Sequence, residues 1–149
     1  MTGVQTCALP ILIYEKSGLF ALSDGESSEM SLLVESKSEN ANFAVEFFAR
    51  QIRASIGSYA AKAGGIDALV FTGGIGEHSA QVRTLVCEQL GFLGFVLNAE
   101  ANQAHLVILN TASSKPILII PADEEAEIAR LAKNLYAEVN HDSTSIASW

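Results

Sequence analysis

Two short apolar runs, each leading directly into a helix-like stretch, constrain the fold of this chain most. The first, DALVFT, covers residues 67–72, and the second, ILII, covers residues 117–120. Such compact and continuously apolar runs are typical of strands that are buried on both faces of a sheet. Because helical patterns alternate with these runs, the sequence predicts an α/β fold in which helices pack on the sheet.

Three helices are predicted around these strands. The first starts near Asn40 and ends before Gly64 and Gly65, with apolar positions at Phe48, Ile52, Ile56, Tyr59, Ala60 and Ala63. The second follows the glycines after the first strand, and its apolar face is Val82, Leu85, Val86 and Leu90. The third follows Pro121, with Asp123 as its cap and an inner face of Ile128, Leu131, Ala132, Leu135 and Tyr136. A short strand is also expected at residues 95–97, and the ambiguous residues 99–109 fit a helix that turns into a strand.

Composition excludes several classes of protein. A chain of 149 residues with 49% apolar and 17% charged residues fits one folded domain. Its net charge of -8 argues against a nucleic-acid-binding face, which has to be basic. The two cysteines form no CxxC pair and no Cys/His cluster, which argues against a disulfide scaffold or a zinc site. No apolar run approaches the ~20 residues that span a bilayer.

The segment FTGGIGEHSAQVR, residues 71–83, joins the first strand to the second helix through three glycines. A strand, a glycine turn and a helix commonly bring a nucleotide to the carboxyl edge of a sheet. A Walker-type loop would need Lys followed by Ser or Thr, but Glu77 and His78 stand there instead. The dinucleotide fingerprint GxGxxG lacks its third glycine. Neither phosphate-binding template therefore fits.

Two interpretations of this segment are open, and they differ in the role of the Glu77 carboxylate. This carboxylate would repel phosphates unless a metal intervened, but it can accept hydrogen bonds from ribose hydroxyls or an adenine amino group. In the alternative, GGIGE is only a tight turn, and Glu77 stabilises a helix N-terminus by about 0.3–1 kcal/mol. On the first interpretation, Gly76→Val is expected to abolish nucleotide binding, because a side chain would then stand where the backbone meets the ligand.

The exit of the second strand, PADEE at residues 121–125, also carries two interpretations. Carboxylates there can help to hold a hydrated Mg²⁺, which commonly takes one or two protein carboxylates and phosphate oxygens. They are equally the ordinary first residues of a helix.

Several of these segments together resemble the C-terminal domain of the acetate/propionate kinase (acetokinase) family. They are LIYEKSGLFALSDGESSEM, AVEFFARQIRASIGSYAAKAGG, GGIDALVFTGGIGEHSAQVR, LGFLG and ILIIPADEEAEIARLA, in the family's order. The resemblance implies a ribonuclease-H-like domain of the actin/hexokinase/Hsp70-like group, with a mixed sheet flanked by helices. It divides the chain into a foreign or unstructured leader at 1–11, a nucleotide-binding domain at 12–137 and a flexible tail at 138–149.

The resemblance also implies an activity. The family transfers the γ-phosphate of ATP to acetate, or in relatives to propionate, which makes it a phosphotransferase with a carboxyl group as acceptor. It uses Mg²⁺, works in the cytoplasm and forms homodimers largely through this half. The sequence leaves open which acid is the substrate. The alternatives to a kinase part are a module that binds ATP or ADP without chemistry and a purely structural dimerisation domain.

Site residues follow from the same resemblance. Those expected at the adenosine pocket are Gly73, Gly74, Ile75, Gly76, Glu77 and His78, with Glu29, Met30 and Ser31 as a second nucleotide-contacting loop. Glu124 is expected to be the magnesium-associated glutamate. The family usually has Asn where His78 stands, and the loop at 29–31 usually begins with Asp and often has Arg third.

Catalytic residues are not assigned in this chain. In the family, the acyl pocket and the phosphoryl-transfer residues precede the stretch that resembles LIYEKSG, where this chain has only MTGVQTCALPI. Phosphoryl transfer depends on positioning and on charge stabilisation around the γ-phosphate. The expectation is therefore a truncated or chimeric gene product that is inactive alone.

Overall fold

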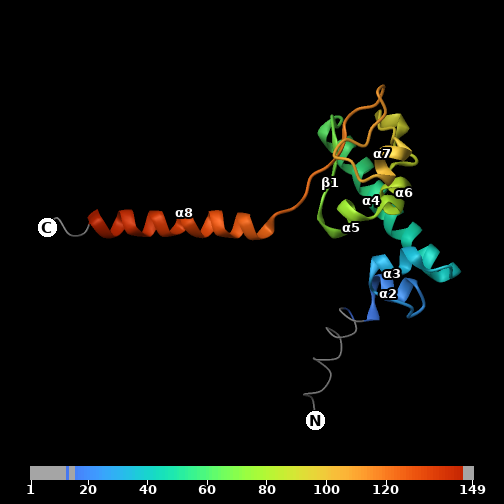
Figure 1. Ribbon diagram of the computed structural model, residues 1–149, viewed down its shortest axis with the longest axis horizontal. Helices are drawn as coiled ribbons and strands as arrows, with labels where there is room; N and C mark the ends of the chain where they lie inside the picture. The colour runs from blue at the N-terminus through green and yellow to red at the C-terminus, as the bar shows by residue number, and fades with distance from the viewer. Residues whose placement is uncertain (1–12, 14–15, 146–149) are drawn as a thin grey trace, which may run out of the picture.

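The computed structural model describes residue 13 and residues 16–145, with side chains up to residue 136. The predicted leader at residues 1–11 lies outside the described residues. The named elements are α2 (Gly18–Leu22), α3 (Met30–Glu35), α4 (Glu39–Ala63), β1 (Leu69–Phe71), α5 (Gly73–His78), α6 (Ala80–Cys87), the 3-10 helix η1 (Gly91–Leu93), α7 (Ala99–Gln103), β2 (Ile117–Ile119) and α8 (Glu124–Ser145) (Figure 1).

The two predicted strands form a parallel pair. Leu69 lies opposite Ile117, and Phe71 lies opposite Ile119. Antiparallel bridges join Leu97 to Asn110 and Ile108 to Leu118, so the segment after α7 is extended beside β2. The α/β prediction is confirmed, whereas the strand expected at residues 95–97 is reduced to the single bridge at Leu97.

Helix α4 begins at Glu39, close to the expected start at Asn40, and ends before Gly64 as predicted. The Ser38 hydroxyl accepts a hydrogen bond from the Ala41 amide over 3.0 Å, and Gly64 ends the helix with a left-handed φ of +74°. The predicted inner face is partly wrong, because Tyr59 is 66% exposed. Small residues instead make the buried face, and they let neighbouring helices approach closely: Ala41, Ala44, Val45, Ala49 and Ala60.

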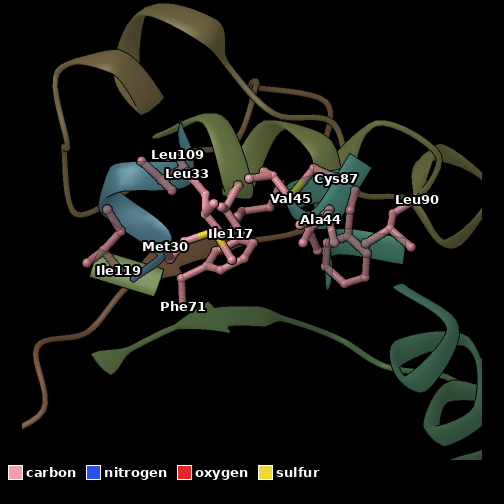
Figure 2. Packing of buried hydrophobic residues seen from close by; sticks show 14 of the residues in the cluster. Met30, Leu33, Ala44, Val45, Phe71, Cys87, Leu90, Leu109, Ile117 and Ile119 are labelled. Carbon is pink, nitrogen blue, oxygen red and sulfur yellow. The ribbon is translucent and has the colours of Figure 1, made fainter. Parts of the chain in front are cut away.

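The hydrophobic core lies between the strand pair and helices α3, α4 and α6. Figure 2 shows apolar side chains from all of these elements converging, with Phe71 and Ile117 from the strands facing Val45 and Cys87 from the helices. The other labelled members are Met30, Leu33, Ala44, Leu90, Leu109 and Ile119. This core holds the carboxyl ends of the strands in place.

The glycine segment is a short helix and not only a turn. Gly73 has a φ of +71°, which glycine adopts at no steric cost, and this residue redirects the chain from β1 into α5. An added Cβ at Gly76 would lie 3.4 Å from the carbonyl carbon of Phe71. The missing side chain at Gly76 therefore allows α5 to pack against the end of β1.

Helix α8 extends away from the other elements (Figure 1). The prediction that its apolar positions form an inner face is wrong for this chain: Ile128 is 67% exposed and Leu135 is 62% exposed. No other described element covers them. The helix also continues to Ser145, into the region predicted as a tail. None of the described helices is long and apolar enough to cross a membrane.

Candidate functional site

The two candidate segments of the sequence meet at one edge of the strand pair. Because β1 and β2 are parallel, their carboxyl ends lie side by side, and the Glu77 carboxylate links the two exits. Its Oε1 accepts a hydrogen bond from the Gly73 amide over 2.7 Å and another from the Ala122 amide over 2.9 Å. The glycine segment and the PADEE segment are thus held together by one side chain.

A cavity of about 690 Å³ lies beside α5. Its walls are α5 and the start of α6, the loop before α3 together with α3, and the end of α7. The polar lining residues are Ser28, Glu29, Ser31, Glu35, His78, Ser79, Gln81, Gln103 and His105. The others are Leu19, Met30, Val34, Gly74, Ile75 and Ala80.

Most of the predicted nucleotide residues line this cavity, although they come from two distant parts of the sequence. The cavity is lined by Glu29, Met30 and Ser31 from one segment and by Gly74, Ile75 and His78 from the other. Three predicted residues lie beside it without lining it: Gly73, Gly76 and Glu77. The carboxylate of Glu77 binds backbone amides at the strand exits, as in the structural interpretation of this segment.

The charge of the cavity limits what it can bind. Its described lining contains two carboxylates, Glu29 and Glu35, and no lysine or arginine. Such a lining cannot neutralise phosphate groups by itself, since phosphates are usually met by basic side chains or a metal. Hydroxyl, amide and imidazole groups beside apolar side chains suit a heterocycle and a sugar.

Arg83 lies behind the cavity wall, and the sequence analysis assigned it no role. The side chain is fully buried, and four of its five N–H groups donate to oxygen atoms. Nη1 donates to the carbonyl oxygens of Gly76 and Glu77, both over 2.8 Å. Nε donates to Asn102 Oδ1 over 2.6 Å, and Nη2 donates to the Asn102 carbonyl over 3.0 Å. Nη2 also lies 3.2 Å from His105 Nδ1. Arg83 therefore joins the end of α5 to α7.

Burial lowers the pKa of the Arg83 guanidinium, while the Coulombic interaction with Cys87 acts in the opposite direction. Asn102 supports the same junction from α7. Its Nδ2 donates to the Ala80 carbonyl over 2.8 Å and to Thr84 Oγ1 over 3.0 Å. The sequence signal for this residue is the position of Arg83 directly after Val82, on a helix whose neighbouring turns are apolar.

The predicted metal residue lies apart from the cavity lining. Glu124 is exposed at the start of α8, and Asp123 uses Oδ1 to accept a hydrogen bond from the Ala126 amide over 2.9 Å. Within the described residues, no three His, Cys, Asp or Glu side chains form a group that could hold a metal ion. Mg²⁺ commonly needs only one or two protein carboxylates when a phosphate supplies further oxygens. An exposed Glu124 fits that mode, and its magnesium role stays a prediction.

Comparison with known proteins gives consistent matches. The sequence profile of the acetokinase family matches residues 2–130. The chain is 44% identical over 123 residues to an acetate kinase of Rhodopseudomonas palustris, covering 80% of this chain and 30% of that protein. It is 38% identical over 122 residues to a propionate kinase of Escherichia fergusonii. That match covers 80% of this chain and 30% of the relative.

A solved structure agrees with these sequence matches. The crystal structure of Porphyromonas gingivalis acetate kinase is similar with a TM-score of 0.79 and 31% identity, covering 90% of this chain and 35% of that one. The chain thus spans about a third of the length of the relatives that it matches.

Proposed function

Because the chain belongs to the acetokinase family, we propose that it forms the nucleotide-binding part of a kinase that transfers phosphate between ATP and a short-chain carboxylate. The acceptor would be acetate or propionate, the acids in the names of the relatives. We assign residues 12–137 to the C-terminal, ribonuclease-H-like domain of such a kinase.

One observation carries this proposal: a single cavity gathers both segments that the family resemblance marks as nucleotide-contacting. Ile75 and Met30 contribute apolar surface to the cavity lining, which suits a purine ring. Glu29, Ser31 and His78 offer polar atoms at the rim. A site of this kind suits the adenosine end of ATP or ADP, and the phosphates would extend beyond the lining residues.

Magnesium completes the proposed site at the phosphate end. When bound, Mg²⁺ neutralises phosphate charge and orients the oxygens that react. In this chain the Glu124 carboxylate would contribute to holding it. The link from Glu77 to Ala122 keeps the segment that leads to Glu124 close to α5.

The proposed role of this chain alone is binding without transfer. Phosphoryl transfer needs positive charge around the γ-phosphate in addition to the metal. The described cavity lining supplies no arginine or lysine for that purpose. We therefore expect ATP or ADP to bind without formation of acetyl phosphate.

A second candidate role is dimerisation, which the exposed apolar face of α8 favours. Ile128, Leu131 and Leu135 lie on one helix and are all exposed, as expected of a face that another chain or domain covers. We include a homodimer in the proposal. We also propose the cytoplasm as its location, on the basis of the family resemblance.

Calorimetry with adenosine, ADP and tripolyphosphate tests the nucleotide proposal. Without Mg²⁺, adenosine is expected to bind within about tenfold of ADP, or ~1.4 kcal/mol, because the lining contacts the nucleoside. Tripolyphosphate is expected not to bind. Binding of tripolyphosphate in the absence of any response to adenosine would contradict the assignment.

An acetyl phosphate assay tests the proposed lack of transfer. The chain is incubated with ATP, Mg²⁺ and acetate, and then in parallel with propionate. No acyl phosphate is expected from either acid. Turnover above that of a heat-denatured sample would show that this chain supplies the transfer residues itself.

A further inference from the structure

We propose that Arg83 is a positioning residue that holds His105 as a neutral imidazole with its proton on Nε2, so that His105 presents an N–H donor to a nucleoside in the cavity. This inference rests on the proposed nucleotide site and names a donor within it. Neither residue is among the site residues predicted from the sequence.

The first step is the donor count of Arg83. A guanidinium has five N–H groups and no acceptor, and it stays protonated in proteins. Four of its donors reach oxygens, namely the carbonyls of Gly76, Glu77 and Asn102 and the side-chain Oδ1 of Asn102. The fifth points at His105 Nδ1 over 3.2 Å. These contacts fix the guanidinium in one orientation.

The second step is the tautomer of His105. Its Nδ1 lies 3.2 Å from Arg83 Nη2 and 3.3 Å from the Glu77 carbonyl oxygen. An Nδ1 proton would donate to Glu77 and leave a buried Arg83 N–H without an acceptor, which is unfavourable because the group is charged and shielded from water. An unprotonated Nδ1 accepts from Arg83 and satisfies all five donors. The neutral ring then carries its proton on Nε2.

The third step is the position of the ring. His105 lies after α7, where its amide donates to the Asn102 carbonyl over 3.1 Å, and its backbone has a left-handed φ of +51°. The side chain lines the cavity while its Nδ1 faces the buried Arg83. The opposite edge of the ring, with Nε2, is thus available to a ligand.

A pH dependence follows from this geometry. The charged and titratable groups that share the cavity with His105 are Glu29 from the loop before α3, Glu35 from α3 and His78 from α5. Arg83 of α6 faces the ring from behind. Protonation of Nδ1 would set an N–H against the Arg83 N–H and place two like charges in contact. Nucleoside binding is therefore expected to be weaker when His105 is doubly protonated.

The tautomer is testable without any ligand. Long-range ¹H–¹⁵N NMR of the full chain at pH 8 distinguishes protonated from unprotonated ring nitrogens, and His105→Asn and His78→Asn identify the signals. We expect His105 to show an unprotonated Nδ1 and a protonated Nε2. In Arg83→Lys, which loses the planar fork, we expect a mixture of tautomers. A protonated Nδ1 in the unaltered chain overturns the proposal.

Binding variants test the donor role. Asparagine at residue 105 places Oδ1 near the former Nδ1, tolerates positive φ and does not titrate, but it lacks the Nε2 donor. We expect His105→Asn to keep the melting temperature of the unaltered chain. Its affinity for ADP at pH 8 is expected to fall about two- to tenfold, as for one lost hydrogen bond. The dependence of this affinity on pH is expected to disappear. A purely structural residue would leave affinity unchanged in this variant, and that result would contradict the donor role.

His78→Asn is the matched control, since it removes the other imidazole of the cavity. We expect the ADP affinity of this variant to keep falling from pH 8 to pH 6. A flat pH profile in the unaltered chain, or loss of the dependence in His78→Asn alone, would refute the inference. Absence of ADP binding at every pH would instead count against the proposed nucleotide site, and the NMR tautomer would then decide the role of Arg83 separately.

Discussion

Glu77 connects the exits of both strands, because one of its carboxylate oxygens serves two backbone amides. Backbone amides left without an acceptor at such a junction destabilise the fold, in proportion to their burial. The residue therefore contributes to the shape of the site even though it does not line the cavity.

The first prediction concerns this link. Glu77→Ala is expected to lower the free energy of unfolding by about 1–3 kcal/mol and to speed hydrogen exchange at the Ala122 amide. Glu77→Gln retains one acceptor oxygen and is expected to lose less. Urea titration and hydrogen exchange measure both effects. If both variants kept full stability but lost ADP affinity, Glu77 would be a nucleotide ligand instead.

The second prediction concerns the Cys87 thiol. Burial raises its pKa from 9.0 to about 12, while the charge of Arg83 opposes the rise. Because the folded pKa lies above the unfolded one, this group supports folding below about pH 9, and that contribution is lost as the pH rises toward 12. We expect iodoacetamide at pH 8 to leave Cys87 unmodified until urea unfolds the chain, as read by peptide mass spectrometry. Rapid native modification would contradict the buried position.

At the scale of one element, two of the three glycines in helix α5, Gly74 and Gly76, have different surroundings. An added Cβ at Gly74 would meet no atom within 4 Å, and Gly74 lines the cavity. An added Cβ at Gly76 would point at Phe71 and not into the cavity. This geometry corrects the expectation that a side chain at Gly76 would stand directly against a ligand.

The third prediction compares these two positions. Gly76→Val is expected to destabilise the fold by about 1–3 kcal/mol through overpacking against β1. Gly74→Val is expected to stay within about 1 kcal/mol of the unaltered chain and to weaken ADP binding on the order of tenfold. Thermal unfolding and calorimetry separate the two effects. Equal losses of stability in both variants would show that α5 is not oriented as described.

At the scale of the whole molecule, α8 extends away from the other described elements, and its apolar residues Ile128, Leu131 and Leu135 are exposed. A helix without tertiary packing is marginally stable in water, and its opening exposes the backbone to proteases. Its exposed basic residues, Arg130 and Lys133, provide cleavage sites for trypsin.

The fourth prediction follows from this arrangement. At low protein concentration, trypsin is expected to cut first after Arg130 and Lys133, while the region of α4 and α6 persists. If a second copy covers the apolar face, raising the concentration is expected to protect both sites, and Leu131→Glu to remove that protection. First cleavage within α4 would contradict the described packing. Mass spectrometry of timed digests and light scattering provide the measurements.

The sequence alone determined the local elements and the family. Alternating apolar runs and helical periodicity specify the strands at Leu69–Phe71 and Ile117–Ile119, because these signals depend on neighbouring residues. The signal at Gly64 that ends α4 is local for the same reason. The acetokinase motifs, read in order, identified the family that the comparisons confirm.

Only the tertiary structure determined which residues from distant parts of the sequence contact one another. It brought the segment of Met30 beside that of Ile75, directed the Glu77 carboxylate to two backbone amides, and buried Arg83 against His105. It also left the apolar face of α8 exposed. These outcomes depend on hydrogen bonds and packing between segments far apart in the chain. The periodicity or motif of one segment cannot predict these contacts, because the residue on the other side of each contact comes from another part of the chain.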